Sequence, residues 1–385
     1  MMKFEFATAG RIVFGRGVVW ELGKLAKPMG SKVFLVSGMP ESETKKLINH
    51  LEEEQLNPVT VYIYKEPTVK GTEEYIKIAK RENCDIVVGF GGGSAMDTGK
   101  IVAAMLTNPG ELMDYLEVVG RGKGIQNPPV PYIAIPTTAG TGAEVARNSV
   151  LCAQEEGLKV SVRSPLMLAR LVLVDPKLTL TVPPHITAST GLDALTQVLE
   201  PFVSNAANPI TDGFCREGLA RAARSLKIAY DQGDNIDARE DMIITSLFGG
   251  LALANAKLGT VHGFASVIGG MFDAPHGMVC AALLPFTVEA NVKALTERQP
   301  ESPALKRYDE IAKILTGNEQ AVAEDGVRWI QELCDYLKVP KLSEFGLTDS
   351  DVKTVVEFTQ IASSTKGNPI VLTYDELEEI LKKAM

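Results

Sequence analysis

The residues with the clearest potential for chemistry lie in the most apolar part of the sequence. His262 falls within a predicted helix, GTVHGFASVIGG, and His276 within a predicted Pro-His-Gly turn, APHGM, and a solvent-exposed imidazole is not expected at either place. Asp193 lies in the helical pattern TGLDALTQVLE, directly beside Leu192, Ala194 and Leu195, and a carboxylate buried in such a helix needs a partner. Two neutral imidazoles and a carboxylate can bind a divalent cation such as zinc or ferrous iron with open coordination positions.

Gln197 is a further candidate ligand, because it lies one helical turn after that aspartate and its amide oxygen shares the same face. A structural interpretation of His262 and His276 is equally open, in which both are core histidines with ordinary hydrogen bonds. The remaining histidines are predicted to face solvent and to have no role: His50 lies in a charged helical pattern and His185 in a proline-rich segment.

A second group of residues suits a phosphate. A predicted strand over Asp85–Phe90 runs directly into Gly91, Gly92, Gly93 and Ser94, and then into a helical pattern. Three glycines remove every Cβ where the backbone approaches a ligand, and Ser94 can act as the helix N-cap. The free N–H groups and partial positive charge of a helix N-terminus favour a pyrophosphate. Because the spacing departs from GxGxxG, a merely tight turn is the alternative.

A similar loop follows the predicted strand over Pro131–Ile135. It places Thr137, Thr138 and Thr141 among glycines in the sequence PTTAGTGAE. Two loops of this kind at one edge of a parallel sheet indicate a dinucleotide. Each threonine, taken alone, is also explained as a hydroxyl that satisfies a turn or a helix cap.

The first half of the chain alternates short β-branched runs with helical patterns, which predicts a mainly parallel sheet with crossover helices. The predicted strands cover Lys32–Ser37, Val59–Tyr64, Asp85–Phe90, Pro131–Ile135 and Leu171–Val174. The predicted helices between them cover Glu41–Gln55, Thr72–Arg81 and Ala95–Leu106.

After Asp175 the sequence changes to long helical patterns without a convincing strand run. The predicted helices cover Ile186–Val203, Ile210–Ala229, Ala238–Ala256, Met278–Ala294, Ala304–Leu315, Gln320–Leu337, Asp349–Ile361 and Tyr374–Lys383, together with a helix that contains His262. We therefore expect an α/β dinucleotide-binding domain over residues 1–180 and an all-helical domain for metal and substrate over residues 181–385.

The composition excludes several classes of function. With 385 residues, 45% hydrophobic and 23% charged, the chain resembles an ordinary globular protein. A net charge of −9 gives no attraction to nucleic acid or anionic lipid, so neither is an expected partner. Five scattered cysteines without a CxxC spacing argue against disulfides or a thiolate zinc site and fit the cytoplasm. The N-terminus lacks a signal peptide's apolar core, and Lys257 interrupts the longest apolar stretch, so no membrane span is expected.

Long, ordered motifs over nearly the whole chain resemble the iron-containing, or group III, alcohol dehydrogenase family. These motifs are RIVFGRG from Arg11, EPT from Glu66, GFGGGSAMDTGK from Gly89, PTTAGTGAEV from Pro136, TGLDALTQVLEPFVS from Thr190 and VHGFASVIGGMFDAPHGMVCAALLP from Val261. The resemblance implies a dehydroquinate synthase-like architecture, with an α/β nucleotide domain, a helical metal domain and a cleft between them. It also implies a homodimer and hydride transfer between nicotinamide C4 and the carbon of a small alcohol or aldehyde.

The same matching implies roles for individual residues. Those matched to the pyrophosphate site are Gly91 to Ser94 and Asp97. Those matched to the wall of the nucleotide pocket are Thr137, Thr138 and Thr141. Those matched to ligands of a divalent iron or zinc ion are Asp193, His262 and His276.

Two positions depart from the family pattern. The usual fourth ligand, a histidine one turn after the aspartate, is Gln197 here, and a further histidine on the substrate side is Ser266. Ser266 would pass a proton through water, or is a small packing residue on an apolar helix. In the glycerol dehydrogenase branch of the family, the aspartate and two histidines look sufficient to bind zinc. The maleylacetate reductase branch looks able to work without metal. A metal-independent reductase and a catalytically silent nucleotide-binding protein are therefore alternatives, although retention of all three matched ligands counts against the silent protein.

The residue after the strand Lys32–Ser37 bears on the choice of nicotinamide. Family members restricted to NAD often carry an aspartate there, which accepts a hydrogen bond from the ribose 2′-OH and repels a 2′-phosphate. Here the position is Gly38, so we expect NADP(H), with NAD(H) tolerated. The alternative is that Gly38 is only a turn residue and that Glu41 or Glu43 reads the ribose.

Overall fold

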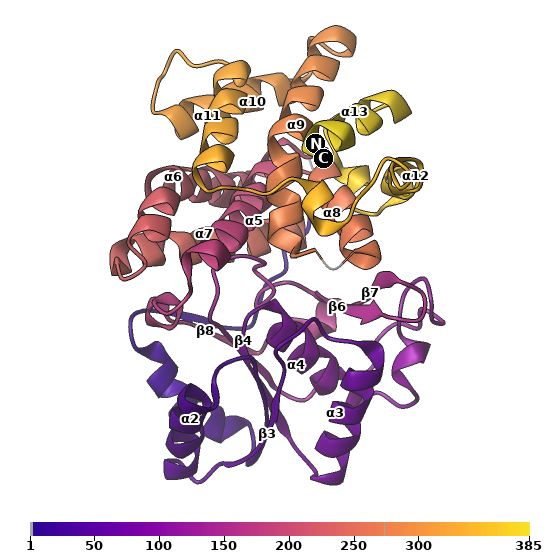
Figure 1. Cartoon of the computed structure of the whole chain (residues 1–385). Coiled ribbons are helices and arrows are strands. Elements are labelled where there is room, and N and C mark those ends of the chain that lie inside the picture. Colours follow the sequence, from indigo (N-terminus) through magenta and orange to yellow (C-terminus); the bar gives the residue numbers. More distant parts are fainter. Residues whose placement is uncertain (1–2, 273) are drawn as a thin grey trace. The chain divides into compact units, whose positions relative to one another are not determined.

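The computed structural model describes residues 3–272 and 274–385, and the chain divides into two compact units. The sheet unit comprises Ala7–Thr138 and Gly142–Thr179, and the helical unit comprises residues 3–6, Ala139–Thr141 and Leu180–Met385. Both are visible in Figure 1. The functional assignment of these parts, with the dinucleotide on residues 1–180 and the metal and substrate on residues 181–385, stays a prediction.

The sheet unit is built on six parallel strands in the order β1-β8-β5-β4-β2-β3. The strands are β1 (Ile12–Phe14), β2 (Lys32–Ser37), β3 (Asn57–Tyr62), β4 (Ile86–Gly91), β5 (Tyr132–Pro136) and β8 (Leu171–Val174). The α/β prediction is confirmed, and the five predicted strands lie within two residues of the observed ones. The short edge strand β1 lies in the segment marked by the RIVFGRG motif.

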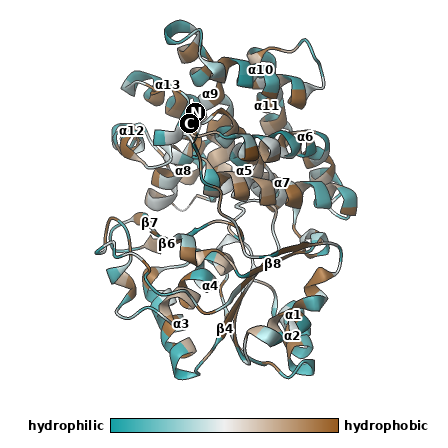
Figure 2. Ribbon diagram, turned by 180° about the vertical axis from the view of Figure 1, so that it is seen from behind, coloured by the Kyte–Doolittle hydropathy of each residue, from teal (hydrophilic) through white to brown (hydrophobic). Residues whose placement is uncertain are grey.

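Helices cover both faces of this sheet, which is why its central strands are apolar throughout. The helices are α1 (Leu22–Ala26), α2 (Glu41–Glu53), α3 (Val69–Arg81) and α4 (Gly93–Met105). Figure 1 shows α2 on one side of the sheet and α3 and α4 on the other. Val33, Leu35 and Val88 share a fully buried cluster with Leu47 and Leu51 of α2. Figure 2 shows β4 and β8 as strongly hydrophobic strands.

The sheet unit also contains an antiparallel hairpin, which the sequence analysis missed. Its strands are β6 (Asn148–Ala153) and β7 (Leu158–Arg163), with alternate residues of β6 buried. A strand buried on one face has no continuous apolar run, and the polar residues of NSVLCAQEEGLKVSVR concealed the alternation.

The helical unit contains nine α-helices among the residues that the structure describes. They are α5 (Pro184–Val203), α6 (Pro209–Asp231), α7 (Ile236–Asn255), α8 (Thr260–Met271), α9 (His276–Arg298), α10 (Pro303–Thr316), α11 (Ala323–Tyr336), α12 (Val352–Ile361) and α13 (Tyr374–Ala384). Short 3-10 turns complete the two units: η1 (Val18–Glu21), η2 (Lys27–Met29), η3 (Leu112–Asp114), η4 (Pro165–Met167), η5 (Pro176–Thr179), η6 (Leu342–Phe345) and η7 (Thr365–Gly367). The all-helical prediction is confirmed.

The most apolar helices of this unit form its core. By length and composition α9 could cross a membrane, and α7 and α8 pass the same test together although they are bent by 96°. However, 72% of the apolar window of α9 is buried inside the protein, as in a core helix of a soluble protein. One prediction here was wrong: His276 is the first residue of α9 rather than part of a turn, because Pro275 takes the N-cap position.

Candidate metal centre

Three helices of the helical unit bring the predicted metal ligands together. Asp193 lies in the middle of α5, His262 in the first turn of α8 and His276 at the start of α9. Asp193 Oδ1 lies 3.4 Å from His262 Nε2 and 3.9 Å from His276 Nε2. Asp193 and His262 are buried, whereas the His276 side chain is 31% exposed. The arrangement is therefore a buried carboxylate with one buried and one accessible imidazole.

Two donor atoms of this group are buried without a hydrogen-bond partner among the described residues. They are Asp193 Oδ1 and His262 Nε2. A buried polar atom that is left unpaired costs free energy, so native proteins rarely keep one without a reason. A divalent cation between the two atoms would satisfy both, which is why these residues fit a metal ion.

The protonation states follow from the same proximity. Burial alone would raise the pKa of Asp193, but the two imidazoles outweigh it, so the pKa is lowered and the carboxylate is ionised. Burial would lower the pKa of His262, yet the neighbouring thiol and the carboxylates of Asp193 and Glu200 raise it well above its usual value. The site thus holds protons that a metal ion displaces, so its metal affinity falls as the pH falls.

A fourth donor, which the sequence analysis missed, joins this group. Cys280 lies one turn after His276 on α9, and its Sγ is 3.7 Å from His276 Nε2. One donor atom each from Asp193, His262, His276 and Cys280 lies within 4.8 Å of every other. The absence of a CxxC spacing does not reveal this donor; the available signal is the four-residue interval between His276 and Cys280 in a helix.

Gln197 lies one turn after Asp193 on α5, but its amide nitrogen points toward Gly140. Its Nε2 donates a hydrogen bond to the carbonyl oxygen of Gly140 at 3.2 Å. Because a carbonyl only accepts, the amide nitrogen must occupy that side. The amide oxygen has no hydrogen-bond partner in the described part of the chain. The role of Gln197 as a ligand stays a prediction.

Glu200 contacts the His262 ring at Nδ1, the nitrogen opposite the one that lies near Asp193. The sequence analysis did not predict this contact. Glu200 Oε2 lies 2.7 Å from His262 Nδ1, and its Oε1 accepts from the backbone N–H of Val261 at 2.7 Å. An ionised carboxylate only accepts, so Nδ1 carries a proton and Nε2 is the atom left for a metal. The signal was the seven-residue spacing from Asp193, which puts both carboxylates on one face of α5.

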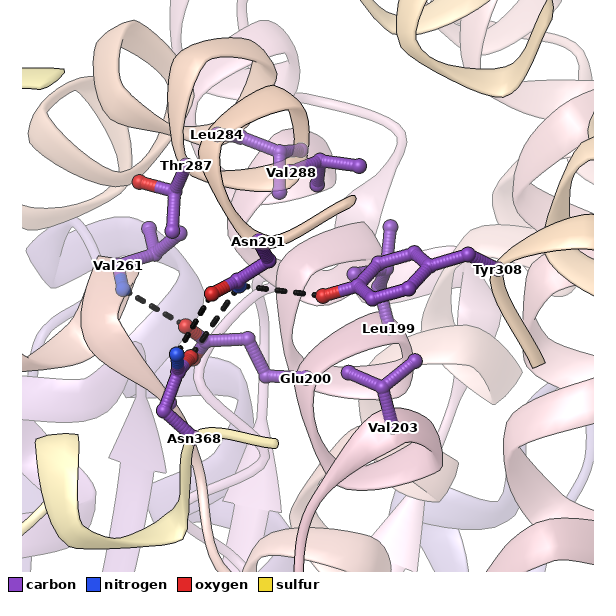
Figure 3. Close-up of a pocket in the computed structure, with 11 residues that line it drawn as sticks. Leu199, Glu200, Val203, Val261, Leu284, Thr287, Val288, Asn291, Tyr308 and Asn368 are labelled. Carbon is purple, nitrogen blue, oxygen red and sulfur yellow. Dashed lines mark hydrogen bonds between the residues drawn. The ribbon is translucent and has the colours of Figure 1, made fainter. Parts of the chain in front are cut away.

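A buried amide network lies beside Glu200 (Figure 3). Asn368 Nδ2 donates to Asn291 Oδ1 at 2.6 Å, and Asn291 Nδ2 donates to the Tyr308 hydroxyl at 3.1 Å. These groups and Glu200 line a small cavity between α5, α9 and α10. The amide network and Glu200 therefore share one buried pocket on the side of Glu200 that faces α9 and α10.

The Glu200→Gln variant is expected to bind the metal about 10- to 100-fold more weakly, the cost typical of losing an outer-sphere partner. The amide can still accept from Val261 N–H only by turning its NH₂ group toward His262 Nδ1. That nitrogen must then accept, which moves the proton to Nε2 and blocks the metal-binding atom. Metal titration and the ¹⁵N shifts of His262 check this. An unchanged tautomer and affinity would contradict it.

The predicted nucleotide residues of the sheet unit meet where the strand order reverses. The chain runs from β2 outward to β3, and then returns to β4 on the other side of β2, so the switch point lies between β2 and β4. Ligands of open α/β sheets bind at such points, beyond the carboxyl ends of the strands. Gly38 follows β2, and Gly91 to Gly93 join β4 to α4.

Backbone contacts hold these loops side by side. The Gly38 N–H donates to the carbonyl of Phe90 at 2.8 Å, and the Thr137 N–H donates to the carbonyl of Gly91 at 3.0 Å. Gly91 has φ 154°, and a Cβ there would lie 3.0 Å from Gly38 Cα, so glycine is required. The structure therefore brings Gly38, Gly91, Gly92, Gly93, Thr137 and Thr138 to one edge of the sheet.

Three other predicted residues are placed differently. Ser94 is the second residue of α4 and not its N-cap; that position is taken by Gly92, so the N-cap prediction was wrong. Asp97 lies one turn further on and accepts from the backbone N–H of Val150, and burial raises its pKa to about 6. Thr141 belongs to the helical unit. The roles of Ser94, Asp97 and Thr141 in cofactor binding stay predictions.

Ser266, the candidate for a proton relay, lies on α8 one turn after His262. Its side chain is exposed, and its hydroxyl donates to the carbonyl of Gly263 at 2.8 Å. This is the ordinary hydrogen bond of a helical serine to the preceding turn. The catalytic role of Ser266 stays a prediction.

Comparisons with known proteins identify the family of the chain. The profile described as "Iron-containing alcohol dehydrogenase" matches residues 9–176, and "Fe-containing alcohol dehydrogenase family, C-terminal" matches residues 187–385. Alcohol dehydrogenase 4 of Schizosaccharomyces pombe is 35% identical over 381 residues, covering 97% of this chain and 87% of that protein. The NAD-dependent methanol dehydrogenase of Bacillus methanolicus is 30% identical over 389 residues, covering 97% of each.

Among solved structures, the alcohol dehydrogenase from Oenococcus oeni superimposes with a TM-score of 0.91 at 30% identity, covering 100% of both chains. The two family profiles together span almost the whole sequence, and the resemblance seen in the motifs is thereby confirmed. The chain belongs to the iron-containing alcohol dehydrogenase family.

Proposed function

We propose that this protein is a metal-assisted, NAD(P)-dependent alcohol dehydrogenase that acts mainly as a reductase of small aldehydes. The observation that carries this proposal is the convergence of Asp193, His262 and His276, with two of their donor atoms buried and unpartnered. The metal-independent reductase and the silent nucleotide-binding protein would both leave those atoms without a purpose. The family membership of the chain supports the same conclusion.

The helical unit would hold the ion through Asp193, His262 and His276. When bound, a divalent cation supplies Lewis-acid polarisation of the substrate oxygen. Glu200 keeps the His262 ring in the orientation and tautomer that expose Nε2. The burial of Asp193 and His262 excludes water, and the accessible His276 lies where a substrate can approach.

The sheet unit would hold the dinucleotide through the loops at its switch point. The N–H groups at the start of α4 are free of side-chain caps, so they are available to a pyrophosphate. The nicotinamide supplies the hydride, and the chain's part is to bind and orient it. The S. pombe and B. methanolicus relatives are named for alcohols, which supports a small-molecule alcohol or aldehyde as the substrate.

The proposal extends to assembly and location. We expect a homodimer in the cytoplasm that binds neither nucleic acid nor membranes. A net charge of −9 disfavours both polyanionic partners, and all five cysteines are free, as in a reducing compartment. Size-exclusion chromatography with light scattering checks the dimer.

NADPH is expected to be used at least as well as NADH, because Gly38 offers no carboxylate to repel a 2′-phosphate. A Cβ at Gly38 would meet its nearest neighbour at 3.4 Å, and the φ of Gly38 lies outside the left-handed region, so Gly38→Asp fits the fold. This variant should lower kcat/KM for NADPH by about 10-fold or more while that for NADH is maintained. A wild-type preference for NADH of well above about tenfold would refute the expectation.

The proposed activity is tested by following the oxidation of NADPH and NADH with a panel of small aldehydes. The protein loaded with ferrous iron or zinc should turn over at least one aldehyde. Removal of the ion by a chelator should abolish turnover, and the ion should restore it. Full activity after complete metal removal would instead favour the metal-independent reductase, and nucleotide binding without any turnover would favour the silent protein.

A further inference from the structure

The metal group contains one donor that the family pattern does not account for. Three of its members match the ligands implied by the sequence, whereas Cys280 does not. We propose that Cys280 Sγ is the fourth protein ligand, and that the resulting Asp-His-His-Cys set holds zinc in preference to ferrous iron. This inference rests on the proposed function, since it requires that the site binds a metal ion.

The position of Cys280 follows from the geometry of α9. The helix begins at His276, and residues four apart in a helix lie on the same face. Cys280 is fully buried, so its thiol points into the protein beside the imidazoles and away from solvent. His276 and Cys280 therefore present their donor atoms to one point from successive turns of one rigid element.

The spacing of the donors fits a tetrahedral ion better than an octahedral one. With zinc distances of about 2.0 Å to nitrogen or oxygen and about 2.3 Å to sulfur, tetrahedral donors lie roughly 3.3 to 3.6 Å apart. Adjacent octahedral donors at about 2.1 Å lie only about 3.0 Å apart. Asp193 Oδ1 lies 3.4 Å from His262 Nε2 and 3.9 Å from His276 Nε2, and Cys280 Sγ lies 3.7 Å from His276 Nε2. The first separation falls in the tetrahedral range, and the other two lie slightly above it and further from the octahedral value.

Two further donor atoms aim at the same point from other helices. Asp193 Oδ1 on α5 and His262 Nε2 on α8 are buried and lack hydrogen-bond partners among the described residues. The cysteine is therefore not an isolated thiol but a member of a group in which two other donor atoms are unsatisfied. A single ion would complete all of them.

Gln197 is the competing fourth ligand, and its chemistry is weaker. Its side chain is tethered by the hydrogen bond to Gly140, and its oxygen is a neutral donor. A thiolate carries a full charge, so Asp193 and Cys280 together balance a divalent ion within the buried site. Soft thiolates favour zinc, whereas hard oxygen donors do not discriminate in its favour. Zinc held by these four residues would still supply Lewis-acid polarisation of a substrate oxygen, because it can expand to five ligands.

Cobalt substitution of the full-length protein tests the ligand directly. The wild-type protein loaded with Co²⁺ should show a thiolate-to-metal charge-transfer band in the near ultraviolet. The Cys280→Ser protein should lack that band. Cys334→Ser is the matched control, because Cys334 is also a buried thiol of the helical unit but donates only to the carbonyl of Ala281 and lies outside the group. It should keep the band.

Metal affinity gives the second readout. Cys280→Ser should weaken zinc binding by about 100-fold or more, beyond the 10- to 100-fold of an outer-sphere loss. Ferrous binding should weaken much less, so the zinc-to-iron affinity ratio should fall at least about 10-fold. If serine disturbs the core at this position, Cys280→Ala gives a second test without a hydroxyl. NADPH binding checks that each variant is folded.

The outcomes separate this inference from the proposed function. One tightly held Co²⁺ per wild-type chain without a charge-transfer band would overturn the cysteine ligand and leave metal-assisted catalysis standing. Unchanged zinc affinity in Cys280→Ser, with a large loss in Gln197→Leu, would assign the fourth position to Gln197 instead. A wild-type protein that holds no ion would contradict both proposals.

Discussion

The His262→Ala protein is expected to lose its tightly bound ion and to turn over at least about 10³-fold more slowly, while its affinity for NADPH stays unchanged. His262 supplies a buried, unpartnered Nε2 to the group, and Glu200 has no other imidazole to orient. Loss of the ion removes several kcal/mol of Lewis-acid stabilisation, and about 1.4 kcal/mol corresponds to a factor of ten in rate.

Metal analysis, steady-state kinetics and fluorescence titration with NADPH check this expectation. The control is His185→Ala, which removes an exposed imidazole from α5, the helix that carries Asp193. It should leave metal content and rate unchanged. Retention of a full equivalent of metal by His262→Ala would contradict the assignment of this ligand, and loss of NADPH binding as well would indicate misfolding.

The Gly92→Ala protein is expected to show the opposite pattern, with intact metal binding and dinucleotide affinity reduced about 10- to 100-fold. Gly92 is the N-cap of α4, and a Cβ there would meet Thr138 Oγ1 at 3.3 Å, which a slight shift of that hydroxyl accommodates. The protein therefore folds, but the methyl group occupies space that the pyrophosphate needs. One or two hydrogen bonds to a charged group, each worth about 1.5–3 kcal/mol, are then lost.

Isothermal titration with NADPH and metal analysis of the same sample check the prediction. Gly124→Ala is the matched control in the sheet unit, since a Cβ at Gly124 meets nothing within 4 Å. It should bind NADPH as the wild type does. Unchanged NADPH affinity in Gly92→Ala would show that the pyrophosphate lies elsewhere. Together with His262→Ala, this pair tests whether metal and dinucleotide use separate groups of residues.

The elements with a strong local signal were predictable from the sequence. Lys32–Ser37 and Leu171–Val174 are continuous β-branched runs because helices cover both faces of the sheet, and their bounds were predicted without error. The long helices of the second half carry apolar residues at helical spacing, because each packs on a shared core. The hairpin β6–β7 was missed, since its one-sided burial leaves only a short alternation among polar residues.

The candidate site was predictable only where residue type alone suggested chemistry. Asp193, His262 and His276 attracted attention as polar groups in apolar surroundings, and the fold brings them together. Cys280 and Glu200 carried no such mark, because cysteine is common in cores and Glu200 resembles any charged helix residue. Their significance depends on which side chains oppose them from α8, and tertiary packing decides that.

The two errors near the glycine loop and α9 have a common cause. Ser94 and His276 were placed by local preference, a serine for an N-cap and Pro-His-Gly for a turn. In the structure Gly92 and Pro275 are the N-caps, so each helix begins two residues before its predicted start. Helix boundaries depend on the backbone conformation of the preceding residues, which single residue types specify poorly.

The most direct test of the central claim is the metal content of the purified protein. Anaerobic reconstitution with ferrous iron or zinc, removal of loosely held ions and elemental analysis give the number of ions per chain. We expect one ion per wild-type chain and none in His262→Ala. The absence of any retained ion in the wild-type protein would contradict the metal-assisted mechanism, and NADPH turnover would then distinguish a metal-independent reductase from a silent nucleotide-binding protein.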